Sequence, residues 1–267
     1  MLRVSVVIID NGLVHYEAIG RGRPVIFLHG WLGSWRYWMP TMESLSDRYR
    51  TYAFDLWGFG DSDHNPQRYD VDSYVTQLTQ FIETMGLSQS PLALVGHALG
   101  AVVALLYASR AREHPLRLMA VSTPLAISEI GKRLSSTGPS LLDRVLGRRG
   151  AADYPEVNMD AEKADAQAIL LSVQSLAGRD VQRVMERIEV PLLMVHGEKD
   201  PFIPPPAADV LRVSEQNIRS IWLAESRHFP MMDEAPKFQR LLKDFLEARP
   251  EDLGSLALKE EWRRRTH

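Results

Sequence analysis

The chain has 267 residues, a formal net charge of −3 at pH 7 and no cysteine. This length allows a large core, the charge argues against a polyanion as main partner, and the lack of cysteine excludes disulfides and thiolate chemistry. We therefore expect a globular protein with no nucleic-acid partner, and the composition mildly favours a cytoplasmic location. No run of about 18 apolar residues occurs, so no membrane span is expected.

Strand and helix patterns alternate along the first half of the chain. Two β-rich runs joined by Asn11-Gly12 predict a hairpin, because this dipeptide favours a tight turn. Short apolar runs follow, together with an amphipathic helical pattern that Gly86 closes. The predicted strands are Val4–Ile9, Leu13–Ile19, Pro24–Leu28, Arg50–Phe54, Leu92–Val95 and Leu116–Val121, and the predicted helices are Val71–Met85 and Ala98–Arg112.

The alternation stops between residues 124 and 187, where glycines and prolines interrupt helical stretches and no clear strand occurs. We interpret this segment as a helical cap, inserted between the two parts of an α/β core, 1–123 and 188–267. The whole pattern predicts a mostly parallel central sheet with helices on both faces. The later elements are predicted helices at Ala161–Leu176, Val181–Ile188, Ala207–Val213 and Pro236–Ala248, and strands at Val190–Val195 and Ile218–Leu223.

Residue 98 is an alanine at a position where the surrounding residues call for a nucleophile. Gly96-His97-Ala98-Leu99-Gly100 follows a predicted strand and opens a predicted helix. This is the frame of the nucleophile elbow G-x-S-x-G, in which a serine stands on a sharp turn at the start of a helix. In parallel sheets ligands bind at the carboxyl ends of strands, where residue 98 is expected to lie.

Four segments at predicted strand ends resemble the α/β-hydrolase superfamily: the elbow, His29–Ser34, Asp55–Ser62 and Val195–Pro204, followed by a histidine loop at His228. The resemblance covers nearly the whole chain outside the cap. It implies that Ala98 occupies the nucleophile position, Asp200 is the triad acid and His228 is the general base, in the family's chain order. It also implies oxyanion-hole donors at the backbone amides of Trp31 and Leu99.

Two features of these segments leave alternatives open. The histidine loop has Arg227 where the family usually has glycine, and its spacing after Pro230 is shifted by one residue. The glycine-rich segment after Asp55 is interpreted as a structural wall of the site, with Asp55 as the second candidate for the acid.

Alanine at residue 98 has three interpretations. In the first, a serine hydrolase has been changed Ser→Ala so that it holds a ligand without turnover; we favour this interpretation, because Asp200 and His228 otherwise have nothing to activate. In the second interpretation, the chain is a natural binding or receptor-like protein without a nucleophile. In the third interpretation residue 98 replaces an aspartate nucleophile, which fits the neighbouring His97 less well.

Apolar side chains around the expected site predict a small apolar or acyl substrate. Pocket residues are predicted at Gly30, His97 and Trp35, beside Trp31, Tyr37 and Trp38. Ester hydrolysis is the favoured reaction, and hydrolysis of a carbon–carbon bond is the alternative. The eight histidines match no metal-binding motif, so neither metal nor cofactor is expected. The cap residues expected to face the substrate are Leu141, Leu142, Val145, Leu146, Ile169, Leu170 and Leu176.

Overall fold

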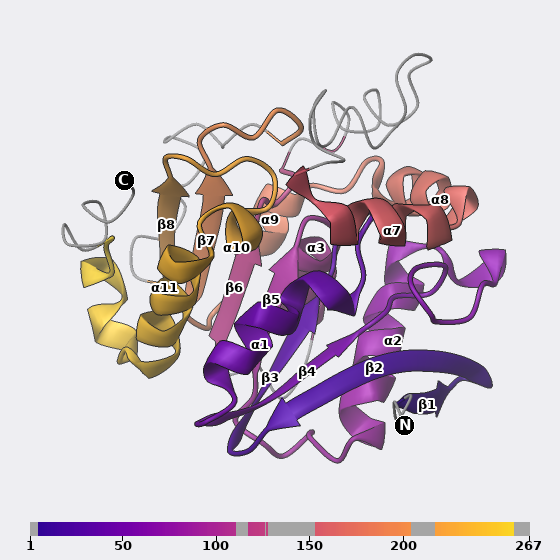
Figure 1. Cartoon of the computed structure of the whole chain (residues 1–267), viewed down its shortest axis with the longest axis horizontal. Coiled ribbons are helices and arrows are strands. Elements are labelled where there is room, and N and C mark those ends of the chain that lie inside the picture. The colour runs from indigo at the N-terminus through magenta and orange to yellow at the C-terminus, as the bar shows by residue number, and fades with distance from the viewer. Residues whose placement is uncertain (1–4, 111–116, 126, 128–152, 204–216, 259–267) are drawn as a thin grey trace.

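The computed structural model describes residues 5–110, 117–125, 127, 153–203 and 217–258. Its centre is an eight-stranded sheet in the order β1-β2-β4-β3-β5-β6-β7-β8 (Figure 1). Strands β1 and β2 pair antiparallel, β2 pairs antiparallel with β4, and every later pair is parallel. The strands are β1 Val6–Ile9, β2 Gly12–Gly20, β3 Arg23–Leu28, β4 Tyr49–Phe54, β5 Ala93–His97, β6 Arg117–Val121, β7 Leu192–Gly197 and β8 Ile218–Leu223.

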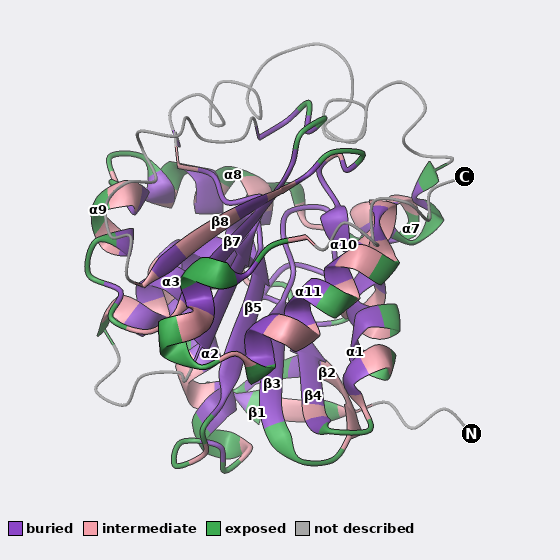
Figure 2. Ribbon diagram, turned by 90° about the vertical axis from the view of Figure 1, so that its left-hand side faces the viewer, coloured by how far each residue is buried: buried purple, intermediate pink, exposed green. Residues whose placement is uncertain are grey.

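Helices cover both faces of this sheet, as Figure 2 shows. Helices α2, α3 and α9 lie on one side of the buried strands, and α1, α10 and α11 lie on the other. The predicted fold class, a mostly parallel sheet between two helical layers, is therefore confirmed. The helices are α1 Met39–Leu45, α2 Val71–Thr84, α3 Leu99–Arg110, α7 Pro155–Lys163, α8 Ala166–Leu176, α9 Val181–Met185, α10 Pro230–Asp233 and α11 Ala235–Glu247, with 3₁₀ turns at Trp35–Trp38, Pro66–Arg68 and Pro250–Ser255.

The first hairpin forms as predicted, but its turn lies one residue earlier than Asn11-Gly12. Ile9 and Gly12 face each other in the ladder, so the two central residues are Asp10 and Asn11. Both have positive φ, 47° and 59°. Positive φ at both central residues defines a type I′ turn, whose twist matches that of the two strands it joins. Asp and Asn tolerate this left-handed conformation. Gly12 instead begins β2.

The predicted helix Ala161–Leu176 is wrong, because the structure has two helices there. Helix α7 ends at Lys163, and α8 begins after Asp165, whose side chain accepts a hydrogen bond from the Gln167 amide at 2.8 Å. The Asp165 amide donates to the carbonyl of Gly58, 2.8 Å away in the core. An N-cap and a long-range contact therefore interrupt a continuous helical pattern.

The end of α2 agrees with the prediction, whereas several other element ends differ from it by a few residues. Gly86 has φ 69° and follows α2, and the Leu87 amide donates to the Ile82 carbonyl, so the predicted helix end is confirmed. Helix α10 was not predicted. The predicted helix Ala207–Val213 lies outside the described residues.

Helices α7, α8 and α9 follow β6 and precede β7 in the chain. In Figure 1, α7 and α8 lie on the side of the sheet where the carboxyl ends of β6, β7 and β8 are found. The division into a cap at 124–187 and two core segments stays a prediction.

Among the residues that the structure describes, no helix combines the length and the apolar character that a membrane crossing requires.

Gly100 allows α3 to pack against the end of β3. A Cβ added to it would lie 2.4 Å from the Leu28 carbonyl oxygen and 2.6 Å from that of His29, and neither backbone atom can yield easily. We expect Gly100→Ala to lower the free energy of unfolding by about 1–3 kcal/mol. Urea unfolding measures this change, with Gly254→Ala as control because nothing lies within 4 Å of the added carbon there. Equal midpoints for the two variants would contradict the close approach.

Candidate active site

Ala98 occupies a sharp turn between β5 and α3. Its φ is 48°, a left-handed conformation that costs an ordinary L-residue roughly 1–2 kcal/mol. The turn is held on both sides, because the Ala98 amide donates to the Val121 carbonyl at 2.9 Å and the Ala98 carbonyl accepts from Val102 at 3.2 Å. Residue 98 is thus fixed at a strand end in a strained conformation, and such strain is typical of functional sites.

Asp200 and His228, predicted as acid and base, lie in direct contact. His228 Nδ1 is 2.8 Å from Asp200 Oδ2, and the two side chains are 2% and 1% exposed. The other carboxylate oxygen, Oδ1, accepts from the amides of Phe202 at 2.8 Å and Ile203 at 2.9 Å. A carboxylate accepting these bonds leaves Nδ1–H as the donor to Oδ2, so Nε2 is the basic nitrogen of the ring.

The two predicted oxyanion donors also follow strands. Leu99 is the first residue of α3, where helical amides have no acceptor within the helix. Trp31 lies in a turn closed by a bond of 3.2 Å from the Gly33 amide to the Gly30 carbonyl, with Leu32 at φ 64°. In the part of the chain described here, neither amide has a hydrogen-bond acceptor. Two such amides are able to bind an oxyanion, and this role stays a prediction.

Gly30 brings this turn against the elbow. A Cβ added to Gly30 would lie 2.8 Å from Ala98 Cβ and 2.9 Å from His97 Nδ1. The two loops are therefore adjacent, as an acyl-transfer site requires. Only glycine permits the approach without displacing one of them.

A chain of buried hydrogen bonds joins these loops, and sequence reasoning missed it. The Gly30 amide donates to the Tyr37 hydroxyl at 2.7 Å, and that hydroxyl lies 3.0 Å from His97 Nδ1. His97 Nε2 lies 2.9 Å from the carbonyl oxygen of His228. Because a carbonyl only accepts, Nε2 carries the proton and Nδ1 accepts from Tyr37. These hydrogen bonds thus connect the turn around Gly30 and Trp31, the turn at Ala98 and the loop of His228.

The His228 carbonyl accepts a second bond, from Ser122 Oγ at 3.1 Å. Ser122 is buried, directly follows β6 and has φ 46°. No motif around Ser122 or Tyr37 distinguishes them in the sequence, because their partners are more than fifty residues away or in other loops. Tyr37 and Trp38, which were predicted to lie against the loop of Gly30 and Trp31, are at most 2% exposed and pack in the core.

Two acidic residues at the junction of α10 and α11 hold the histidine loop by hydrogen bonds. Glu234 Oε2 accepts from Ser226 Oγ at 2.8 Å and from the Glu225 amide at 3.0 Å. Arg227, in place of glycine, donates its amide to Asp233 Oδ2 at 2.7 Å. The acidic residues therefore fix the path of the loop toward His228 despite the shifted spacing.

Asp55, the second candidate for the acid, has other partners. Its carboxylate accepts from the amides of Trp35 and Asp61, both at 2.9 Å, and its nearest imidazole partner is His29 at 4.0 Å. Burial raises the pKa of Asp55 to about 7. Its contacts support the interpretation of this loop as a structural wall, whereas Asp200 is the carboxylate beside His228.

Helices α7 and α8 contact the turn around Trp31 directly. Trp31 Nε1 donates to Ser172 Oγ on α8 at 3.0 Å, and Ser34 Oγ bonds to the buried Asp160 on α7. Arg36 reaches Asp160 Oδ1 at 3.0 Å and Asp61 Oδ2 at 3.1 Å. The turn that carries a predicted oxyanion donor is therefore held in place by α7 and α8.

Several predicted pocket residues have structural partners. Both ring nitrogens of His97 are bonded, and Trp35 lies against His15 and Arg36, with ring and guanidinium centres at 5.5 and 4.9 Å. Leu176 is fully buried and Leu170 is 48% exposed. A pocket role for Gly30, His97 and Trp35 stays a prediction. The cap positions Leu141, Leu142, Val145 and Leu146 lie outside the described residues.

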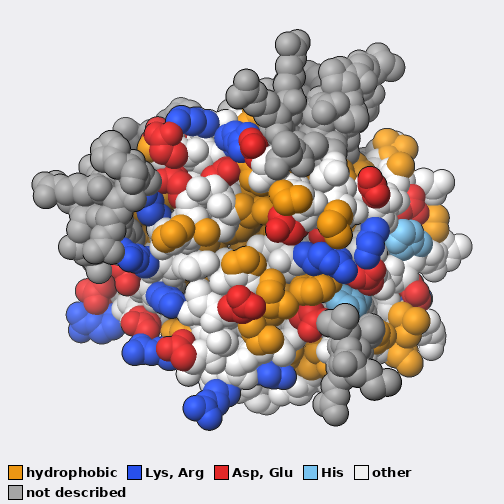
Figure 3. All heavy atoms as spheres, viewed as in Figure 1, with side chains coloured by type: hydrophobic (Ala, Val, Ile, Leu, Met, Phe, Trp, Pro, Cys, Tyr) orange, Lys and Arg blue, Asp and Glu red, His pale blue; other side chains and the backbone are white. Residues whose placement is uncertain are grey.

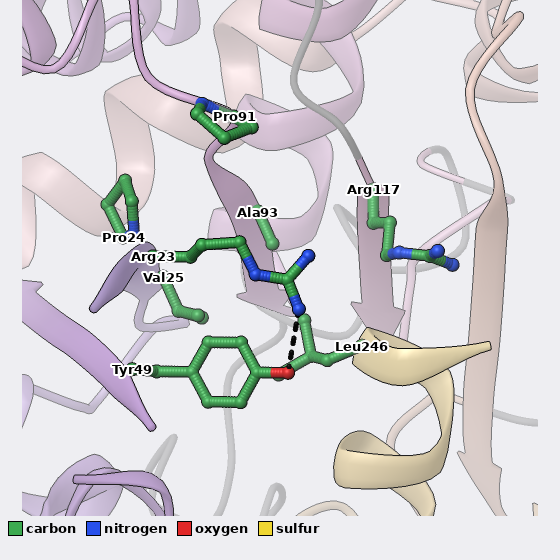
Figure 4. A pocket seen from close by; sticks show the side chains of 8 residues that line it. All are labelled: Arg23, Pro24, Val25, Tyr49, Pro91, Ala93, Arg117 and Leu246. Atoms are coloured by element: carbon green, nitrogen blue, oxygen red, sulfur yellow. Dashed lines mark hydrogen bonds between the residues drawn. The ribbon is translucent and has the colours of Figure 1, made fainter. Parts of the chain in front are cut away.

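A small pocket lies at the amino-terminal ends of the parallel strands, at the end of the sheet opposite to Ala98 (Figure 4). Arg23, Ala93 and Arg117 line it from the first residues of β3, β5 and β6, and Arg23 donates to the Tyr49 hydroxyl at 3.3 Å. Because ligands of parallel sheets bind at the carboxyl ends of strands, this pocket is not the candidate active site.

Comparison with known proteins identifies the family. A family model described as the alpha/beta hydrolase family matches residues 25–238. The chain belongs to the α/β hydrolase family. This α/β hydrolase is 27% identical over 254 residues to the AB hydrolase superfamily protein YisY of Bacillus subtilis, covering 86% of this chain and 93% of YisY.

Two further proteins are similar along most of their length. The pimeloyl-[acyl-carrier protein] methyl ester esterase of Aliivibrio fischeri is 24% identical, over 87% of this chain and 97% of that enzyme. The solved structure of an esterase from Exiguobacterium antarcticum has a TM-score of 0.78 at 21% identity, covering 92% of this chain and all of the other. The latter likeness shows the shared fold.

Buried neutral histidines make the stability of this α/β hydrolase depend on pH. Burial lowers the pKa of both His29 and His196 to about 4, from an ordinary 6.5. Because the unfolded chain binds more protons between these values, stability falls as pH drops through this window. We expect each histidine to remove about 2 kcal/mol between pH 7 and pH 5.

His196→Phe tests this dependence, since neither ring nitrogen of His196 has a hydrogen-bond partner within the described residues. The free energy of unfolding, measured in urea at pH 7 and pH 5, should fall by about 2 kcal/mol less in the variant than in the parent. An unchanged pH dependence would show that His196 does not stay neutral in the folded chain.

Proposed function

We propose that this α/β hydrolase binds a small ester or related acyl compound in a serine-hydrolase site whose nucleophilic hydroxyl is missing at residue 98. The observations that carry the proposal are the left-handed conformation of Ala98 and the direct contact between Asp200 and His228. The left-handed backbone at residue 98 costs free energy. In a serine hydrolase this turn positions the nucleophilic oxygen, which alanine lacks. The esterase relatives, as named, act on ester substrates, which supports this substrate class.

With a serine at residue 98, the chemistry would follow the triad scheme. His228 Nε2 takes the hydroxyl proton while the oxygen attacks the ester carbonyl, and Asp200 stabilises the resulting imidazolium. The carbonyl oxygen gains negative charge between the amides of Trp31 and Leu99. His228 then returns the proton to the departing alkoxide, and water releases the acid by the same steps. In the chain as it stands, the methyl group of Ala98 stops this sequence before the first bond forms.

Substrate selection is assigned to the inserted segment and the oxyanion turn. Trp31 contributes its amide to the hole and its indole to a bond with Ser172 on α8. In this proposal α7 and α8, which belong to the predicted cap at 124–187, cover an apolar acyl group. Mixed acidic and basic side chains cover the described part of the face in Figure 3, which favours a small-molecule substrate over a polyanion.

Binding of a labelled ester by the unaltered chain tests the proposal. Methyl acetate, methyl hexanoate and methyl benzoate, each with a ¹³C carbonyl, are titrated with protein and followed by NMR. At least one should bind with a downfield shift of its carbonyl carbon, because two amides polarise the carbonyl, and should remain intact.

Gly30→Ala is the blocked control, because its added carbon would lie 2.8 Å from Ala98 Cβ. Gly254→Ala is the matched control and should bind as the parent does. Failure of all three esters to bind, or binding with an unshifted carbonyl, would contradict the proposal. A shifted ester that an Ala98→Ser variant also leaves intact would favour the receptor-like alternative.

A further inference from the structure

His15 is a buried histidine with no role in the candidate active site. It lies on β2, and its side chain is 7% exposed. Neither ring nitrogen has a hydrogen-bond partner within the described residues, and its closest charged neighbour is Glu17 Oε1 at 3.7 Å. Burying a polar ring without partners costs free energy, so an imidazole in this state is suited to accept a ligand.

Two carboxylates converge on this ring. One ring nitrogen of His15 and one oxygen each of Asp55 and Asp61 all lie within 4.8 Å of one another. Asp55 is fully buried directly after β4, whereas the Asp61 side chain is 36% exposed at the surface. Each Asp55 oxygen accepts one amide, from Trp35 or Asp61, which leaves a further lone pair on each.

Carboxyl groups outnumber cations around the ring. Asp61 is paired with Arg36 and with Lys163, and Arg36 also contacts Asp160. No arginine or lysine forms an ion pair with Asp55 or Glu17 in the described part of the chain. Asp55 and Glu17 therefore have no cationic side chain paired with them there, and an ion bound beside His15 would supply one.

We propose that His15, Asp55 and Asp61 bind one divalent transition-metal ion, with Zn²⁺ or Co²⁺ as the fitting class. An imidazole with two carboxylates suits these ions better than the all-oxygen sets of Mg²⁺ and Ca²⁺. Ligand atoms around a tetrahedral ion lie roughly 3.4 Å apart, given bonds of roughly 2.1 Å. Because the Asp61 side chain is exposed, it can move toward His15 and Asp55 until all three ligand atoms reach the ion. Water completes the coordination.

The ion and Lys163 compete for Asp61. Lys163 is the last residue of α7 and bonds to Asp61 Oδ1, while Arg36 holds Oδ2. A bound ion and the ammonium group of Lys163 compete for the negative charge of Asp61, so metal binding weakens this ion pair. The site thus links the core sheet to the inserted segment at a place separate from Ala98.

Zn²⁺ titration of the untagged full chain, followed by competition with a chromophoric chelator, tests the proposal. We expect one ion per chain, with at least about tenfold weaker binding in His15→Gln and in Asp61→Asn, since even outer-shell partners are worth that factor. Lys163→Met should bind about threefold more tightly, because it removes a competing surface ion pair. With Co²⁺, the parent should show visible d–d absorption that His15→Gln lacks.

His64→Gln is the matched control, because His64 is an exposed histidine close to Asp61 in the sequence. It should bind metal as the parent does. If His15→Gln does not fold, Asp61→Asn and Lys163→Met still decide the matter, since both change surface side chains. The absence of a one-to-one complex, or binding that neither His15→Gln nor Asp61→Asn weakens, would overturn the proposal.

Discussion

Replacing Ala98 with serine is expected to raise the rate of p-nitrophenyl ester hydrolysis by between about 10³- and 10⁶-fold. Removing the nucleophile of a serine hydrolase triad costs up to roughly 2 × 10⁶ in turnover. The backbone at residue 98 already has φ 48°, and Asp200 and His228 are already in contact at 2.8 Å. The substitution adds one oxygen to an alanine, so no rearrangement of the elbow is needed. Steady-state rates on acetate, butyrate and hexanoate esters measure the gain.

Ala98→Gly is the matched control for this experiment. Glycine adopts the positive φ freely but supplies no hydroxyl, so its activity should equal that of the parent. A further His228→Gln change should return the serine variant to the parental rate. A folded serine variant that gains no activity on any ester, or one whose gain survives His228→Gln, would contradict the assigned roles.

Asp200→Asn in the Ala98→Ser background is expected to reduce kcat by about 10³- to 10⁴-fold. The amides of Phe202 and Ile203 require an acceptor at the position of Oδ1. The asparagine oxygen therefore takes that place, and its NH₂ group faces His228 Nδ1. An imidazole that must accept at Nδ1 carries its proton on Nε2, so it cannot take the serine proton. KM should change little, because the ester contacts neither group directly.

Glu198→Gln provides the control for the second variant. Glu198 is an exposed acid two residues before Asp200, and its loss should leave kcat within about twofold of the serine variant. Full activity in Asp200→Asn would remove Asp200 from the triad.

The regular elements could be predicted from local patterns, because apolar periodicity and turn residues report directly on the backbone. Asp200 and His228 both follow predicted strands, which end at one side of a parallel sheet, but their roles as acid and base came from the resemblance to the α/β-hydrolase motifs. The break at Asp165 could not be found, because it depends on the Gly58 carbonyl more than a hundred residues away. The bonds from Tyr37 and Ser122 to the histidines are likewise long-range, and no local pattern encodes them. The cluster of His15, Asp55 and Asp61 has no motif spacing for the same reason.

The most direct test of the central claim, that residue 98 stands at a nucleophile position, is covalent labelling of the serine variant. A fluorophosphonate is attacked by an activated serine, which displaces fluoride and keeps the phosphonyl group. Intact mass and peptide mapping should show one phosphonyl group on residue 98 of Ala98→Ser. The parent, Ala98→Gly and the double variant with His228→Gln should stay unlabelled. A folded Ala98→Ser chain that remains unlabelled, or is labelled at another serine, would contradict the account.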